Sequence, residues 1–313
     1  MIEHIKKLVS IPSFTNNFDA VDECFRICKE MVLDSTFIFE KKINNYKSIL
    51  FSNCNSLNLD VLSVCHIDVY KSEKYEMTEA TDKIFGRGVF DMKSFVVSNL
   101  TNLNRIIETK NKVKHGVLVT SDEEIGGENG AKFWANNKNL KTKIVLDSDS
   151  GYNLSTVIET NLGAITIKLL GNKQNINKTI ETIKKEFGSF YCEDFGDEID
   201  MNFDDFDIIN HLNSCMSDNV KFKVLMFNSC TKNDINDRYH KLYNKIAKNN
   251  GINIQYKVIS ATNDSRYFAE RGVNIISNQA TGGNNHKDGE WLDKNSFFIF
   301  NKIQYEFLES FND

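Results

Sequence analysis

Apolar residues recur along the chain in two alternating patterns, one with the length of a buried strand and one with the spacing of a helix. Helical spacing runs through residues 1–9, 92–109 and 292–311, where polar positions separate the apolar ones. The predicted strands cover residues 47–51, 59–64, 116–120, 144–146, 254–260 and 273–277. Alternation of this kind from start to end predicts an α/β fold.

The middle of the chain has a different pattern. Residues 164–170 and 220–227 each alternate between apolar and polar positions, and a charged helical segment at residues 176–187 lies between them. We therefore predict a small inserted α+β domain at residues 162–232. Residues 1–161 and 233–313 would together form the main domain.

Composition narrows the classes of partner. The formal net charge is −5 and the sequence holds no dense block of Lys and Arg, which argues against nucleic acid or an anionic membrane as a partner. No apolar stretch approaches the roughly 18 residues that a membrane-spanning helix needs. The seven cysteines are scattered, which favours a reducing compartment over a disulfide framework, so we predict a cytoplasmic protein.

Acidic and histidine side chains gather where predicted strands end. They are His66 and Asp68 after residues 59–64, Asp91 after a Gly-Arg-Gly turn, Glu123 and Glu124 after residues 116–120, Asp147 and Asp149 after residues 144–146, and His286 after a glycine-containing loop. A fold that sets strand ends side by side would bring these groups to one point. Crowded carboxylates need positive charge among them, so we predict a site for two divalent cations.

In two neighbouring pairs, His66 with Asp68 and Glu123 with Glu124, the two side chains could have different roles. Asp68 is placed to hydrogen-bond the far imidazole nitrogen of His66 and so fix the tautomer of a metal ligand. Glu123 and Glu124 diverge at a strand end, so one can bind metal while the other acts as a general base.

Asp147 and Asp149 are alternate positions after one strand, and either could complete the ligands of the first metal. Taken singly, each residue of the set also fits an ordinary strand exit, N-cap or solvated loop. Only their joint order at strand ends favours the metal site.

Several motifs together resemble those of a known family. They are His66-x-Asp68, Gly86-Arg87-Gly88-x-x-Asp91-Met92-Lys93, Asp122-Glu123-Glu124-Ile125-Gly126-Gly127, Asn263-Asp264-Ser265-Arg266-Tyr267-Phe268 and His286-Lys287-x-x-Glu290. The chain resembles the zinc exopeptidase and amidohydrolase family that contains glutamate carboxypeptidase, aminoacylase, acetylornithine deacetylase and succinyl-diaminopimelate desuccinylase. The resemblance implies a catalytic domain with a mixed central sheet flanked by helices, interrupted by a lid domain that dimerises in many relatives.

The resemblance also implies roles for the metal-site residues. His66, Asp91 and Asp147 would hold one metal, with Asp147 preferred to Asp149 because it directly ends its strand. Asp91, Glu124 and His286 would hold the other, with Asp91 bridging. Glu123 would be the catalytic base that takes a proton from a metal-bridging water, and Asp68 would support His66. The metals would be zinc, with cobalt or manganese as alternatives.

Substrate contacts are less completely matched. Arg266 occupies the position of an arginine that relatives carry, and its guanidinium fork suits a free carboxylate. Many relatives have a lid histidine that stabilises the oxyanion, but residues 171–175 contain none, so Asn175 is the replacement donor that we consider. Ser94 also replaces the glycine that usually follows Met-Lys in relatives.

The sequence therefore predicts a metal-dependent exopeptidase of carboxypeptidase or dipeptidase type, acting on small peptides. The alternative on the same site is an N-acyl-amino-acid deacylase or deacetylase. A hydrolase with a single metal and a non-catalytic binding relative are further alternatives; the latter predicts loss of the base or of a ligand, yet every position is filled. The resemblance also suggests a homodimer formed through the lid domain, an assembly that the missing lid histidine leaves open.

Overall fold

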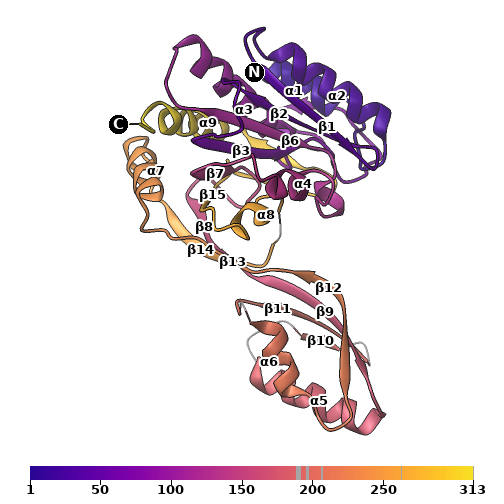
Figure 1. The fold of residues 1–313 in the computed structure, drawn as a ribbon. Coiled ribbons are helices and arrows are strands. Elements are labelled where there is room, and N and C mark those ends of the chain that lie inside the picture. Colours follow the sequence, from indigo (N-terminus) through magenta and orange to yellow (C-terminus); the bar gives the residue numbers. More distant parts are fainter. Residues whose placement is uncertain (188–191, 195–196, 206, 262, 313) are drawn as a thin grey trace. The chain divides into compact units, whose positions relative to one another are not determined.

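The computed structural model describes residues 1–187, 192–194, 197–205, 207–261 and 263–312 (Figure 1). Its chain divides into two compact units. The first contains Met1–Ile158, Asn233–Lys257 and Asn263–Asp313, and the second contains Glu159–Lys232 and Val258–Thr262. The sequence-based boundaries at residues 162 and 232 lie close to this division, although residues 258–262 were not expected in the second unit.

The first unit is built on a six-stranded mixed sheet. In spatial order its strands are β1 (Phe37–Ile43), β2 (Tyr46–Ser52), β6 (His115–Thr120), β3 (Val61–His66), β7 (Ile144–Asp147) and β15 (Ile275–Ser277). The pairs β3–β6, β3–β7 and β7–β15 are parallel, whereas β1–β2 and β2–β6 are antiparallel. The prediction of an α/β fold with a mixed central sheet is confirmed.

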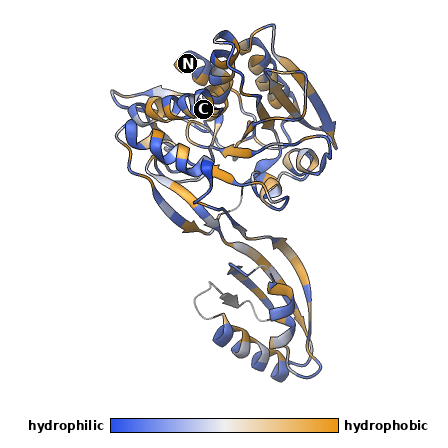
Figure 2. Cartoon of the chain, turned by 60° about the vertical axis from the view of Figure 1, so that its left-hand side comes forward, coloured by the Kyte–Doolittle hydropathy of each residue, from blue (hydrophilic) through white to orange (hydrophobic). Residues whose placement is uncertain are grey.

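Helices cover both faces of this sheet (Figure 1). Those of the first unit are α1 (Ile2–Val9), α2 (Phe18–Met31), α3 (Lys93–Glu108), α4 (Ala131–Asn136), α7 (Arg238–Asn249), α8 (Arg266–Ala269) and α9 (Lys294–Glu309). Val117 and Val119 of β6 join the core that includes α3 and α9, while Leu118 between them joins the core that includes Trp134 of α4. All residues of β3 and β6 are buried, as expected for central strands covered on both faces. In Figure 2, where orange marks hydrophobic residues, such residues are frequent in the strands inside the first unit.

Two further small sheets are present among the described residues. One has the order β16 (Gly282–Gly283), β17 (Trp291–Asp293), β5 (Lys83–Phe85) and β4 (Thr78–Glu79). The other has the order β13 (Thr231–Lys232), β8 (Thr156–Asn161) and β14 (Gln255–Ile259). The pairing of β17 with β5 matters for function, because it brings the loop that follows β5 next to the segment that precedes Trp291.

Among its described residues, the second unit contains a four-stranded sheet and two helices. Its strands have the order β10 (Cys192–Asp194), β11 (Glu198–Phe203), β9 (Gly163–Leu170) and β12 (Lys221–Asn228), and its helices are α5 (Lys173–Glu186) and α6 (Ile208–Cys215). Apolar residues of both helices pack with alternate residues of β9 and β11 in one core. This α+β arrangement is the kind that the alternating pattern predicted.

Most predicted elements are present with shifts of a few residues at their ends. The helix expected at 92–109 is α3, and the strand expected at 59–64 is β3, which extends to His66. None of the described helices is both long and apolar enough to cross a lipid bilayer. Cys24, Cys28, Cys54, Cys65, Cys215 and Cys230 are free thiols.

Candidate metal centre

Three parallel neighbours in the central sheet carry the site. β3 ends at His66, and its register places His66 opposite Thr120 at the end of β6. β7, on the other side of β3, ends at Asp147. Since parallel strands point the same way, the segments that follow them leave the sheet at one edge, where α/β proteins place their sites. The prediction that strand ends lie side by side is therefore confirmed.

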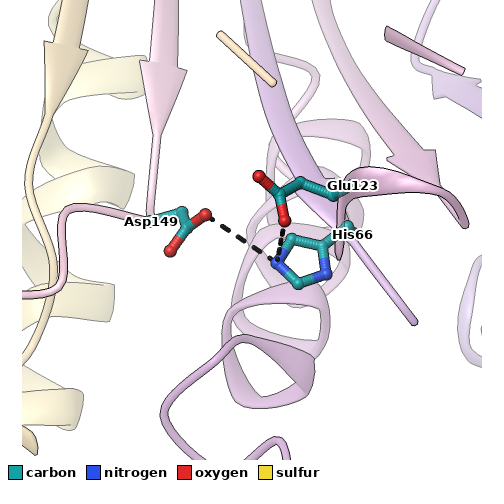
Figure 3. Close-up of side chains that lie close together, drawn as sticks. All are labelled: His66, Glu123 and Asp149. Carbon is teal, nitrogen blue, oxygen red and sulfur yellow. Dashed lines mark ion pairs between the residues drawn. The ribbon is translucent and has the colours of Figure 1, made fainter. Parts of the chain in front are cut away.

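His66 lies at the centre of the first group of ligands. Its Nε2 atom is 3.9 Å from Oε2 of Glu123 and 3.8 Å from Oδ2 of Asp149 (Figure 3). Its other ring nitrogen, Nδ1, lies 2.9 Å from the backbone carbonyl of Asp68. When Nδ1–H donates to that carbonyl, the lone pair of Nε2 faces the carboxylates, which is the tautomer that a metal requires.

Asp91 links the first group to a second one. Its Oδ1 is 3.1 Å from Nε2 of His66, and its Oδ2 is 2.9 Å from Nε2 of His286. Glu124 completes the second group, with Oε2 at 3.1 Å from Nε2 of His286. The two oxygens of Asp91 thus face the two histidines separately, as a carboxylate must if it is to bridge two cations.

The chemistry of these donors fits divalent cations. Ligand atoms of His66, Glu123 and Asp149 lie within 4.8 Å of one another, and the same holds for Asp91, Glu124 and His286. Imidazole nitrogens and carboxylate oxygens in this mixture suit zinc, cobalt or manganese. Oε1 of Glu124 is buried and has no hydrogen-bond partner among the described residues, so it too is available to an ion.

The pKa values of the site residues also fit a site for cations. Burial raises the pKa of Glu123 well above its ordinary value, and the charge of Asp149 adds to this against the opposing charge of His66. Burial, followed by the charge of Asp91, likewise raises the pKa of Asp149. Hydrogen bonds to Asp91 and Glu124 raise the pKa of His286 to about 10. The metal-free site therefore holds protons more strongly than isolated side chains would, and cations would take the place of those protons.

Asp68 supports the site differently from the sequence-based expectation. Its backbone carbonyl, rather than its carboxylate, makes the close contact with the ring of His66; the carboxylate Oδ1 is 3.5 Å from Nδ1. The carboxylate instead accepts backbone N–H bonds from Glu123 at 3.3 Å and Glu124 at 3.2 Å, and a hydroxyl bond from Thr15 at 2.9 Å. Asp68 thus joins the ends of β3 and β6 and orients both glutamates.

The preference for Asp147 as a ligand does not agree with the structure. The carboxylate of Asp147 accepts hydrogen bonds from Ser277 Oγ at 2.5 Å and from Asn263 Nδ2 at 2.7 Å. Asp147 is the last residue of β7, and its carboxylate is already hydrogen-bonded to these two side chains. Asp149 lies beyond the end of the strand, and its carboxylate faces His66. This geometry favours Asp149 over Asp147 as the candidate ligand beside His66.

Glu290 is a site residue to which the sequence analysis assigned no role. It is 1% exposed and accepts backbone hydrogen bonds from Phe90 at 2.9 Å and Asp91 at 3.0 Å, while its other oxygen accepts one from Arg87 at 2.9 Å. Its place in the His286 motif was the signal that the sequence offered. The pairing of β17 with β5 then explains how Glu290 reaches the Asp91 loop.

Tyr70 was missed entirely. Its ring stacks on the imidazole of His286, with centroids 5.1 Å apart and an interplanar angle of 20°. The side chain of His286 is 47% exposed, and the ring of Tyr70 covers one face of its imidazole. Tyr70 lies just after the His66 motif but carries no pattern of its own.

The two predicted substrate contacts lie in different surroundings. Arg266 is 6% exposed, and its terminal nitrogens donate to the backbone carbonyls of Asn263 at 2.9 Å and Gly126 at 2.7 Å. It thus holds the loop after Glu124, a contact that the sequence did not predict. Asn175 belongs to α5 in the second unit, where its side-chain amide donates to the carbonyl of Asp218 at 2.8 Å. The substrate roles of both residues stay predictions.

Comparison with known proteins gives one family. The model of the family described as peptidase family M20/M25/M40 matches residues 62–310, well over half of the chain. Succinyl-diaminopimelate desuccinylase of Orientia tsutsugamushi (strain Ikeda) is 30% identical over 135 residues, which are 40% of this chain and 34% of that protein. The match thus spans about a third of the length of that relative.

Solved structures share the fold. The M20 family metallo-carboxypeptidase Sso-CP2 of Sulfolobus solfataricus superposes with a TM-score of 0.75 at 15% identity, covering 98% of this chain and 98% of that one. A dinuclear metal binding peptidase of the M20 family from Bacillus subtilis has a TM-score of 0.69 at 10% identity, covering 98% of this chain and 96% of that one. At these identities the likeness shows the fold.

Proposed function

The chain belongs to peptidase family M20/M25/M40, and we propose that it hydrolyses amide bonds with the help of two divalent cations. One observation carries the proposal most directly. The carboxylate of Asp91 lies between Nε2 of His66 and Nε2 of His286, at 3.1 Å and 2.9 Å from them. The ordinary alternative for this position is an aspartate that only caps a helix. Such an aspartate would not be expected to lie between two histidines that also contact further carboxylates.

The ligands divide into two sets under this proposal. His66 and Asp149 would hold one cation, Glu124 and His286 the other, and Asp91 would contribute one oxygen to each. When bound, such cations polarise a carbonyl group and lower the pKa of water towards neutrality.

Glu123 supplies the acid–base chemistry. Its carboxylate is 3.9 Å from His66 Nε2, and its side chain is 12% exposed, so a substrate or a water can reach it. The burial and neighbouring charges that raise its pKa suit a group that must accept a proton and then release it. Glu123 takes the proton of the attacking water and passes it to the departing amine, while Asp68 holds its backbone in place.

Peptides are the substrate class that we favour, cleaved near a terminus as by a carboxypeptidase or dipeptidase. The support is the likeness in fold to a metallo-carboxypeptidase over nearly the whole chain. Removal of an N-acyl group from an amino acid is the second candidate, favoured by the sequence match to a desuccinylase. A panel of dipeptides and N-acyl amino acids separates the two, since the chemistry at the scissile bond is the same.

The test of the proposed function is Glu123→Gln. The substitution keeps the size of the side chain but removes its ability to accept a proton, so both metal equivalents and the fold should remain while turnover falls by about a hundredfold or more. The matched control is Glu128→Gln in the same loop, where the side chain is 68% exposed and pairs with Lys132. Turnover of Glu123→Gln at the rate of the control would refute the proposal.

A further inference from the structure

We propose that Gln279 is a positioning residue that sets the spacing between the two halves of the metal centre. The inference rests on the proposed two-cation function. It concerns a side chain that is fully buried and lies outside both ligand groups. Gln279 follows β15, the strand that pairs in parallel with β7.

Gln279 makes one hydrogen bond to each of two loops that carry candidate ligands, the Asp91 loop and the Asp149 loop. Its Nε2 donates to the backbone carbonyl of Phe90 at 2.7 Å, and Phe90 directly precedes Asp91. Its Oε1 accepts from the backbone N–H of Gly151 at 2.7 Å, two residues after Asp149. A single amide group therefore spans from the Asp91 loop to the Asp149 loop.

Other restraints hold these loops one at a time. Glu290 accepts from the backbone of Asp91, and Asn263 donates to the carbonyl of Asp149 at 3.0 Å. In the part of the chain that the structure describes, Gln279 is the side chain whose hydrogen bonds reach both loops. Asp91 faces both histidines, whereas Asp149 faces only His66. The separation of the two loops therefore sets the distance between the two ion positions.

The amide group suits this place for a chemical reason. It offers a donor and an acceptor at opposite corners of one planar group, as a carbonyl on one side and an N–H on the other require. Methionine has a similar length and volume but would leave both backbone groups without this partner. Glutamate would still accept from Gly151 but, when ionised, could not donate to Phe90.

The experiment is a stepwise metal titration of the metal-free protein with zinc, in competition with a chromophoric chelator. The variant is Gln279→Met. Its control is Gln304→Met, which changes another buried glutamine (1% exposed), in α9, whose amide donates to Tyr243 at 3.3 Å. We expect the second equivalent to bind about tenfold or more weakly in Gln279→Met, and the first to change by less than about threefold. Gln304→Met should match the wild type.

A second readout reports the spacing itself. In the dimanganese form, the electron paramagnetic resonance spectrum of the wild type should show two coupled ions, and Gln279→Met should weaken that coupling. If thermal unfolding shows that Gln279→Met does not fold, the same titration and spectrum are recorded for Gln279→Glu, with the same expected changes.

The outcomes separate the two proposals. Binding of both equivalents as in the wild type, or an equal loss of both equivalents, would overturn the role of Gln279 and leave the proposed function standing. A wild-type protein that binds fewer than two ions would instead overturn the proposed function, and this inference with it.

Discussion

The carboxylate of Glu290 accepts a hydrogen bond from the backbone N–H of Asp91 at 3.0 Å, although 199 residues separate them along the chain. The same carboxylate accepts from Gly88 and Phe90 and pairs with Arg87. One buried side chain near the C-terminal helix therefore shapes the loop that presents Asp91 to both histidines. The position of Asp91 therefore depends on the pairing of β17 with β5.

Glu290→Gln should loosen this loop. The amide would place an N–H group against backbone donors or against Arg87, so we expect the free energy of unfolding to fall by about 1–3 kcal/mol and zinc to bind more weakly. Urea unfolding of the metal-free protein and a zinc titration measure the two effects. The exposed Glu108→Gln is the control, and equal behaviour of the two variants would contradict the assigned role.

Asp149→Asn and Asp147→Asn should differ in metal content. Asp149 faces His66, so its amide replacement should remove most of the binding of one metal equivalent. Asp147→Asn should keep both equivalents, because an amide oxygen can still accept from Ser277 and Asn263. Metal analysis after dialysis distinguishes them, and the reverse pattern would restore Asp147 as the ligand.

Tyr70 should matter through its ring and not through its hydroxyl. Tyr70→Ala removes the stacking on His286, so we expect the affinity for the cation beside Glu124 and His286 to fall by about threefold to tenfold, given the ~0.5–1.5 kcal/mol typical of ring pairs. Tyr70→Phe keeps the ring and should bind like the wild type. A loss in Tyr70→Phe as large as that in Tyr70→Ala would show that the stacking is not the cause.

The stability of the metal-free protein should fall as pH rises. The pKa of His286 is raised from 6.5 to about 10, so its protonated form stabilises the fold fully below pH 6.5, and this contribution is lost as pH rises through 10. The raised pKa values of Glu123 and Asp149 act in the same direction, because ionising these buried acids costs stability as pH rises above their ordinary range.

Cations replace those protons, so the rise in melting temperature on adding zinc should grow between pH 6.5 and pH 9. Thermal unfolding with and without zinc across this range checks the expectation. A zinc-induced rise that shrinks with increasing pH would contradict it.

The fold could be predicted well where hydrophobic periodicity is strong. β3, β6 and α3 were expected nearly at their observed ends, because buried strands and an amphipathic helix have distinct periods. The edge strand β1 was missed, since its residues are mostly exposed and alternate weakly. α7 was also missed, because its many charged residues left only a few buried positions to mark its apolar face.

The site could be predicted in its chemistry but not in all its contacts. His66, Asp91, Glu124 and His286 were expected because acids and histidines that crowd together at strand ends need cations among them. The sequence did not show which of Asp147 and Asp149 is free to face His66. That depends on hydrogen bonds from Ser277 of β15 and from Asn263 to Asp147, which are tertiary contacts. Gln279 and Glu290 hydrogen-bond backbone groups far away in sequence. No local pattern marks Gln279, and the His286 motif includes Glu290 without indicating its contacts.

Anomalous diffraction from zinc-soaked crystals tests the central claim most directly. The account predicts two peaks per chain, one beside His66 and Asp149 and the other beside Glu124 and His286, with the carboxylate of Asp91 between them. A single peak, or peaks remote from Asp91, would contradict a two-cation centre in this protein.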